Sequence, residues 1–313
     1  MLGSTILGGE IHVLKSERIM KPLHEDQIHN GPFLEACTHI WSDDVSRSKK
    51  SGVWDYYKAI SKEFNKPLVD HTNIPARGII FVGMCHLLEQ IFNSLPQSGS
   101  YIFIHRTNDR PYTEQMNRCK PKSVKHVYTV DCRGDFPNVT AIPFGNASIN
   151  GEDNMVKMVA QKQYFEKLPT TKLFVCFNTN PDTPHRIEAI KVLKDKPFAF
   201  VYELEYPHKQ MDGETFYKNV KHHKYTMALA GCGADASRQW AAIQLGSIPI
   251  VTDCPEMRHF ADLPIIFCPK DMNDITEEWL DLQSGKVKGK STYMMRASYW
   301  SNHISEEKNI WGI

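Results

Sequence analysis

The sequence predicts an α/β protein, and two observations lead to that prediction. From residue 78 onward, short apolar runs alternate with polar turns and amphipathic helical stretches, and a second series of the same kind begins after Pro169. Alternation of this kind is typical of parallel sheets with helices on both faces. Apolar residues make up 41% of the 313 residues, which is enough for the core of one large domain or two ordinary ones.

The first series of elements is expected between residues 53 and 168. Apolar runs predict strands at 78–82, 101–105, 126–130 and 139–143. Helical spacing of apolar residues predicts helices at 53–64, 85–95, 112–119 and 154–168. The polar, glycine-bearing stretch 146–153 is typical of a surface loop.

The second series follows Pro169, where we place a domain boundary. Strands are predicted at 172–177, 198–202, 225–230, 248–251 and 263–268. Helices are predicted at 183–193, 213–222, 274–282 and 291–310, and from Asp235 onward. The alternation alone fits either two Rossmann-like domains or a single doubly wound sheet.

The stretch from Lys224 to Val251 carries the clearest chemical signal. A strand leads into a glycine turn at 231–233, and a helix is predicted to begin at Asp235. The first amide groups of a helix are unpaired and its dipole is positive there, so a turn of this kind can hold an anion. Arg238 would lie in the first helical turn, where a guanidinium adds a bidentate phosphate contact.

Other interpretations of this stretch differ in how well they fit. The chain lacks the Gly-Lys-Ser/Thr of a phosphate-binding P-loop, and the spacing of a dinucleotide fingerprint fails after Gly233. A plain strand–loop–helix unit, with Asp235 as the helix cap and Arg238 facing solvent, fits the local pattern equally well.

The string SRQWAAIQLGSIPIV, at 237–251, closely resembles a motif of exostosin-type glycosyltransferases. In that family a serine and an arginine open a helix, an aromatic and small-residue face follows, and Gly-x-Ile-Pro-Ile/Val leads into the next strand. The similarity is specific over 224–251 and looser over 171–268. The sequence departs from the pattern at Ala241, where many family members carry a glutamate that holds the donor ribose.

The resemblance implies a GT-B fold, in which two Rossmann-like domains face each other across a cleft. Residues 1–168 would bind the acceptor, residues 169–290 would bind the nucleotide sugar, and 291–313 would form a helix that packs back on the first domain. The donor would be a UDP-sugar and the acceptor a glycan or glycoprotein. The residues assigned to the donor are Asn180, Arg186, Gly231, Gly233, Asp235, Ser237 and Arg238.

Inverting transfer, which we expect by analogy with the family, needs a general base within hydrogen-bond reach of the attacking hydroxyl. His86 is the favoured base because it follows the first strand of the regular pattern. Asp131, at a later strand end, would orient His86. The other candidates for the base are Asp131 itself, Asp109, Asp70 and His71.

No metal or other cofactor is expected. A metal-dependent GT-A enzyme needs an Asp-x-Asp that holds the ion against the diphosphate. Neither the adjacent Asp43 and Asp44 nor the DMND stretch at 271–274 has that spacing after a strand. His222 and His223 are interpreted as a solvated helix end. Two alternatives stay open: a non-catalytic sugar- or nucleotide-binding module, and a nucleotide-binding protein unrelated to sugars, such as a phosphotransferase.

Composition narrows the possible partners and location. The net charge of +1 gives no general polyanion-binding surface, so nucleic acid is not an expected partner. Apolar runs are too short to span a bilayer, and the N-terminus lacks a signal-peptide pattern. The eight scattered cysteines are interpreted as reduced, which indicates the cytoplasm and leaves the sequons at Asn138 and Asn146 unused. A cytoplasmic relative of this family suggests a large DNA virus as the source and a pentose such as xylose as the sugar.

Overall fold

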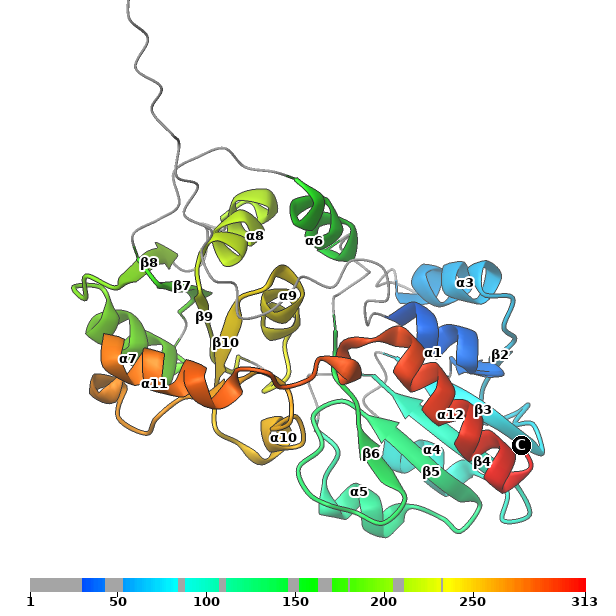
Figure 1. Ribbon diagram of the computed structural model, residues 1–313. Coiled ribbons are helices and arrows are strands. Elements are labelled where there is room, and N and C mark those ends of the chain that lie inside the picture. Colours follow the sequence, from blue (N-terminus) through cyan, green and yellow to red (C-terminus); the bar gives the residue numbers. More distant parts are fainter. Residues whose placement is uncertain are drawn as a thin grey trace, which may run out of the picture.

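The computed structural model describes residues 30–42, 53–83, 88–106, 111–145, 152–162, 171–179, 181–204, 211–231 and 233–313. These residues form two parallel sheets, one of six strands and one of five, and helices pack on both faces of each sheet (Figure 1). The predicted α/β class is confirmed. The alternative of a single doubly wound sheet is wrong, because no strand pairing joins the two sheets within the described part of the chain.

The six-stranded sheet comes from the N-terminal half of the chain and has the order β2-β1-β3-β4-β5-β6. Its strands are β1 (His39–Trp41), β2 (Leu68–Val69), β3 (Arg77–Val82), β4 (Ser100–His105), β5 (Val124–Thr129) and β6 (Val139–Ala141). The last four lie at the predicted apolar runs. The sequence pattern did not predict β1 or β2, which are three and two residues long.

The helices on this sheet are α1 (Asn30–Ala36), α3 (Val53–Glu63), α4 (Leu88–Ser94), α5 (Glu114–Cys119) and α12 (Ala297–Trp311). Strand side chains alternate between the two faces, and β3 shows the consequence. Ile79 and Phe81 pack in the cluster formed with α1, α3 and α12, whereas Ile80 and Val82 pack in the cluster formed with α4. Both faces of the sheet are therefore buried.

The five-stranded sheet has the order β11-β10-β9-β7-β8. Its strands are β7 (Leu173–Asn178), β8 (Ala199–Leu204), β9 (Tyr225–Ala228), β10 (Ile248–Val251) and β11 (Ile266–Phe267). The helices of this half are α6 (Glu152–Gln161), α7 (Pro184–Leu193), α8 (Gly213–His222), α9 (Ser237–Leu245), α10 (Pro255–Arg258) and α11 (Glu277–Val287). Two 3-10 turns lie at Met272–Asp274 and Tyr293–Met295.

Strand β7 again divides the helices between two faces. Val175 and Phe177 pack with α7 and α11, whereas Phe174 and Cys176 pack with α6, α8 and α9. Helix α6 thus packs on the second sheet, through side chains such as Val156, although it precedes the predicted boundary at Pro169.

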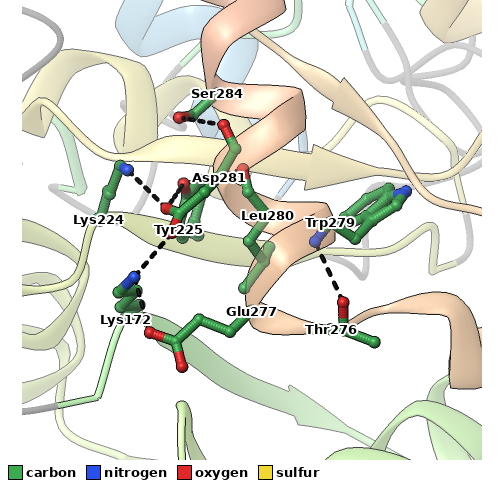
Figure 2. Close-up of polar contacts among 9 residues, drawn as sticks. All are labelled: Lys172, Lys224, Tyr225, Thr276, Glu277, Trp279, Leu280, Asp281 and Ser284. Atoms are coloured by element: carbon green, nitrogen blue, oxygen red, sulfur yellow. Dashed lines mark hydrogen bonds and ion pairs between the residues drawn. The ribbon is translucent and has the colours of Figure 1, made fainter.

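Helix α11 is anchored to the amino ends of β7 and β9 (Figure 2). The buried Tyr225 hydroxyl donates to the Leu280 carbonyl oxygen at 3.0 Å. The Asp281 carboxylate accepts from Lys172 Nζ at 3.0 Å and from Lys224 Nζ at 3.1 Å. The hydrogen bond from Lys172 holds the pKa of Asp281 below its usual range. This end of the sheet is therefore occupied by structural contacts.

Helix α12 returns to the first sheet, where it packs beside α1 (Figure 1). Trp300 and Ile304 of α12 are buried in the same cluster as Phe33 of α1. The Tyr128 hydroxyl of β5 lies 2.8 Å from Nδ1 of His303. The cluster continues through Trp240 of α9, so one apolar core joins the two halves of the molecule.

Candidate functional site

In the five-stranded sheet, the direction in which the chain adds successive strands reverses between β7 and β9, and a pocket lies near that point. The connection after β7 runs through α7 on one face, and the connection after β9 runs through α9 on the other face. Adjacent parallel strands whose connections diverge in this way form a switch point, and α/β proteins bind ligands outside the carboxyl ends of such strands.

The pocket has a volume of about 480 Å³, within the range of small-molecule sites. Its wall at the end of β7 includes Cys176 and Asn178, and α8 contributes Phe216 and Tyr217. The N-terminus of α9 contributes two residues assigned to the donor from the sequence, Ser237 and Arg238. The pocket therefore combines aromatic walls with a basic, polar end.

Arg238 is held over aromatic rings at that end of the pocket. Its guanidinium carbon lies 5.8 Å from the ring centroids of both Phe177 and Phe216, within the range of cation–π contact. Helix α9 begins at Ser237, so the predicted start at Asp235 is wrong by two residues. The N-cap position is held by Ala236, whose side chain cannot cap the helix. Because Ser237 and Arg238 of the first turn line the pocket, the positive end of the helix dipole lies beside it.

Arg186, from the first turn of α7, connects the ends of β7 and β9. Its Nη2 donates to the Leu229 carbonyl oxygen at 2.8 Å, and its Nη1 donates to the Asn178 carbonyl oxygen at 3.3 Å. Only 9% of the residue is exposed. A Cβ at position 231 would lie 2.6 Å from Arg186 Nη2, so a larger residue there would displace the guanidinium from its present position. Gly233 lies in the same turn, where its carbonyl oxygen accepts from the Gly231 N–H at 3.0 Å. Arg186 and both glycines therefore lie beside the pocket, where Arg186 holds the ends of β7 and β9 together.

Asp235 is buried at the junction between the two sheets. Its Oδ2 accepts from the Phe144 N–H at 2.7 Å, and its Oδ1 accepts from the Trp240 indole and, at 3.2 Å, from the Gln239 amide. The sequence assigns Asp235 to the donor site, but none of its surface is exposed and its carboxylate is held by these contacts within the protein. The cause is tertiary: the segments after β5 and β6 pack over the turn that precedes α9.

Asp131 lies on the opposite side of this junction, just beyond β5. Its Oδ1 accepts a 2.8 Å hydrogen bond from the Asp235 N–H. Burial raises the pKa of the Asp235 carboxyl well above its usual range, and the charge of Asp131 raises this pKa further. The expected strand-end position of Asp131 is observed, and its carboxylate accepts from the Asp235 N–H.

Further contacts at this junction join the carboxyl ends of the two sheets. Arg133 Nε lies 2.7 Å from Glu256 Oε1 on α10, and only 5% of Glu256 is exposed. His259 Nε2 lies 3.0 Å from the Cys132 carbonyl oxygen. The short segment 131–133 therefore contacts the second half of the chain at three points.

Three candidates lie outside the described residues, namely His86, Asp109 and Asn180. Asp70, by contrast, lies in a turn after β2, where hydrogen bonds from Thr72 lower its pKa. His71 follows it in the same exposed turn. Neither is brought near the pocket beside Arg238, whose walls come from the second half of the chain.

The prediction that His223 is solvated is wrong. The residue is 3% exposed, and its ring stacks near Phe174 and Phe200 at 5.5 and 5.8 Å between centroids. Its Nδ1 lies 2.7 Å from the Asn219 carbonyl oxygen, and burial lowers its pKa. Among the described residues, no group of three or more His, Cys, Asp or Glu side chains could hold a metal ion.

Sequence reasoning missed the aromatic wall of the pocket. Phe216 and Tyr217 are adjacent on α8, so one of them would be expected on the exposed side of an amphipathic helix. Phe216 is only partly buried and also packs on Phe174, as expected for a residue of a pocket wall.

No protein-family model matches the sequence, and no curated protein matches it significantly. No described helix is both long enough and apolar enough to cross a membrane.

Proposed function

We propose that the chain is a GT-B glycosyltransferase of exostosin type, which transfers a sugar from a UDP-sugar to a glycan hydroxyl. The observation that carries the proposal is the pocket beside the N-terminus of α9, where Ser237 and Arg238 contribute to the wall. The string that resembles the family motif forms α9 and β10, so the resemblance and the pocket coincide.

The chemistry of the donor matches the two ends of this pocket. As the sugar leaves, negative charge grows on the diphosphate, and preorganised positive groups stabilise it most effectively. Arg238 and the N-terminus of α9 would supply that stabilisation without a metal ion. Phe216 and Tyr217 would pack against the uridine. Arg186 and the glycine turn would hold the ends of β7 and β9 in place.

The acceptor is assigned to the first sheet. Its own switch point lies between β1 and β3, since β1 connects to β2 on one side and β3 connects to β4 on the other. His86 lies in the sequence between β3 and α4. It would take the proton of the attacking hydroxyl in an inverting transfer. Xylose is the donor sugar to test first, and the cytoplasm of a virus-infected cell is the proposed location.

A non-catalytic nucleotide- or sugar-binding module is the second candidate. The observation that favours it is Ala241, which is fully buried among apolar side chains of α6, α8 and β7. A methyl group there cannot replace the ribose-binding carboxylate that many exostosin-type enzymes have at this position.

Calorimetric titration with UDP, followed by turnover assays on a panel of UDP-sugars, separates the candidates. A glycosyltransferase should bind UDP and should release UDP from at least one UDP-sugar. The rate of UDP release should rise when a glycan acceptor is present. UDP binding without turnover of any donor would favour the module. Absence of UDP binding would refute both the UDP-sugar transferase and a module that binds UDP.

A further inference from the structure

A second pocket lies at the far end of the first sheet from the junction. It has a volume of about 370 Å³ and includes Val124, where β5 begins. Asp131 follows the other end of the same strand. At about 3.3 Å per strand residue, this pocket is roughly 20 Å from the junction. It is therefore separate from the pocket beside Arg238.

The described lining of this pocket is basic. It includes Lys120, Lys122 and Lys125, together with the amides of Asn117 and Asn138, and it contains no acidic side chain. Like charges around one hollow repel each other, and an anion placed among them removes that repulsion. Lys120 is half-buried, and burial lowers its pKa, as expected for an ammonium that lacks full hydration.

The ammonium groups are positioned by the backbone. Lys120 Nζ donates to the Pro137 carbonyl oxygen at 2.8 Å, and Lys125 Nζ donates to the Lys122 carbonyl oxygen at 2.9 Å. An ammonium has three N–H donors, so one such bond fixes the group and leaves donors for a ligand. Two side chains are therefore held in place before any ligand binds.

Trp311 of α12 supplies an aromatic wall. Its indole N–H donates to Glu307 Oε2 at 2.8 Å, which fixes the ring, and Lys125 Nζ lies 6.0 Å from the ring centroid. Glu307 does not line the pocket, and its Oε2 also lies 3.6 Å from His126 Nδ1. The Trp311 side chain is exposed and so offers apolar ring surface beside the lysines.

We propose that this pocket binds a phosphate monoester carried on a ring, as in a sugar phosphate or a mononucleotide. The phosphate would lie among Lys120, Lys122 and Lys125, and the ring would lie against Trp311. This inference does not depend on the proposed glycosyltransferase activity.

The test is calorimetric titration of the full chain with phenyl phosphate, inorganic phosphate and phenol. We expect phenyl phosphate to bind at least about fivefold more tightly than inorganic phosphate, with no binding of phenol, because charge and ring both contribute. The double variant Lys122→Gln with Lys125→Gln should weaken phenyl phosphate binding about tenfold or more. Trp311→Ala should remove the preference for phenyl phosphate over inorganic phosphate.

Two control variants separate this pocket from other sites. Lys286→Gln removes an exposed lysine on α11 and should bind phenyl phosphate as the wild type does. Arg238→Ala alters the other pocket, so this variant should still bind phenyl phosphate, and the double lysine substitution should weaken that remaining binding. The proposal is overturned if phenyl phosphate does not bind, if the double lysine variant binds it normally, or if Arg238→Ala abolishes the binding. Titration with UMP and glucose 1-phosphate into Arg238→Ala then shows which ring the pocket prefers.

Discussion

The backbone N–H of Asp235 donates a 2.8 Å hydrogen bond to the carboxylate of Asp131, and this contact joins the carboxyl ends of the two sheets. The two carboxyl groups lie close together in a buried junction, where the charge of one raises the pKa of the other. The junction that bounds the proposed active site should therefore respond to pH.

We expect the free energy of unfolding to fall as the pH rises from the ordinary aspartate range through the raised pKa of Asp235. Over that interval the folded state holds a proton that the unfolded state has lost, so rising pH favours unfolding. Asp131→Asn should reduce this loss, because it removes the neighbouring charge and keeps an oxygen to accept from Asp235. Asparagine also tolerates the left-handed backbone of this position, where φ is 52°.

Urea unfolding at about pH 5 and about pH 8 measures this effect in both proteins. The matched control is Asp195→Asn, which removes an exposed carboxylate in the turn after α7. An equal loss of stability in wild type and Asp131→Asn would contradict the coupling.

Arg238 is expected to dominate UDP affinity. Arg238→Ala should weaken UDP binding by at least about tenfold, because a charge-assisted hydrogen bond contributes about 1.5–3 kcal/mol. Arg238→Lys should give an intermediate loss, since lysine keeps the charge without the planar fork. Calorimetric titration checks both, with Arg258→Ala, an exposed arginine paired with Asp253, as the control. Wild-type affinity in Arg238→Ala would refute the donor site.

Arg186 should affect stability more than binding. Arg186→Ala removes the hydrogen bonds to the Leu229 and Asn178 carbonyl oxygens, and we expect a cost of about 2–3 kcal/mol in the free energy of unfolding. UDP affinity should fall less than in Arg238→Ala. If Arg186→Ala instead unfolds like the wild type and loses UDP binding, this arginine contacts the donor, as the sequence suggested.

Much of the fold could be predicted because long strands leave a clear apolar pattern. The six-residue runs at β3, β4 and β7 were found for this reason. Strands β1 and β2 lie in a stretch that shows no regular apolar pattern, and β1 pairs between β2 and β3. The order of the strands depends on pairing between distant segments of the chain, and the switch points follow from that order. A local sequence pattern contains no information on such pairing.

The candidate site was predictable only in part, for a related reason. An aspartate before a helix resembles a cap, and nothing near Asp235 in sequence reveals that Asp131 and Phe144 cover it. Arg186 and Arg238 have the same local setting, the first turn of a helix after a strand. Their contacts differ because the carbonyl groups of Asn178 and Leu229 lie beside one guanidinium, whereas the other lies at a pocket.

The anchor of α11 should depend on its buried hydrogen bond rather than its ion pairs (Figure 2). Tyr225→Phe should cost about 1 kcal/mol in the free energy of unfolding, because it removes the buried hydrogen bond from the tyrosine hydroxyl to the Leu280 carbonyl oxygen. Lys172→Ala and Lys224→Ala should each cost about 0.5 kcal/mol or less, since their pairs with Asp281 are exposed to solvent. Urea unfolding measures all three, and high salt should reduce only the lysine effects. A larger loss of stability in either lysine variant than in Tyr225→Phe would contradict this ranking.

Ala241 offers a test of what the pocket holds, because it lies one turn beyond Arg238 on α9. Ala241→Glu buries a carboxylate among apolar side chains and should lower stability by about 2 kcal/mol or more. If a ribose binds nearby, its hydroxyls would donate to this carboxylate, so UDP should raise the melting temperature more in the variant than in the wild type. Ala241→Leu is the control, since it adds bulk without an acceptor and should reduce the shift. A smaller UDP-induced shift in Ala241→Glu than in the wild type would mean that the ribose does not bind at this position.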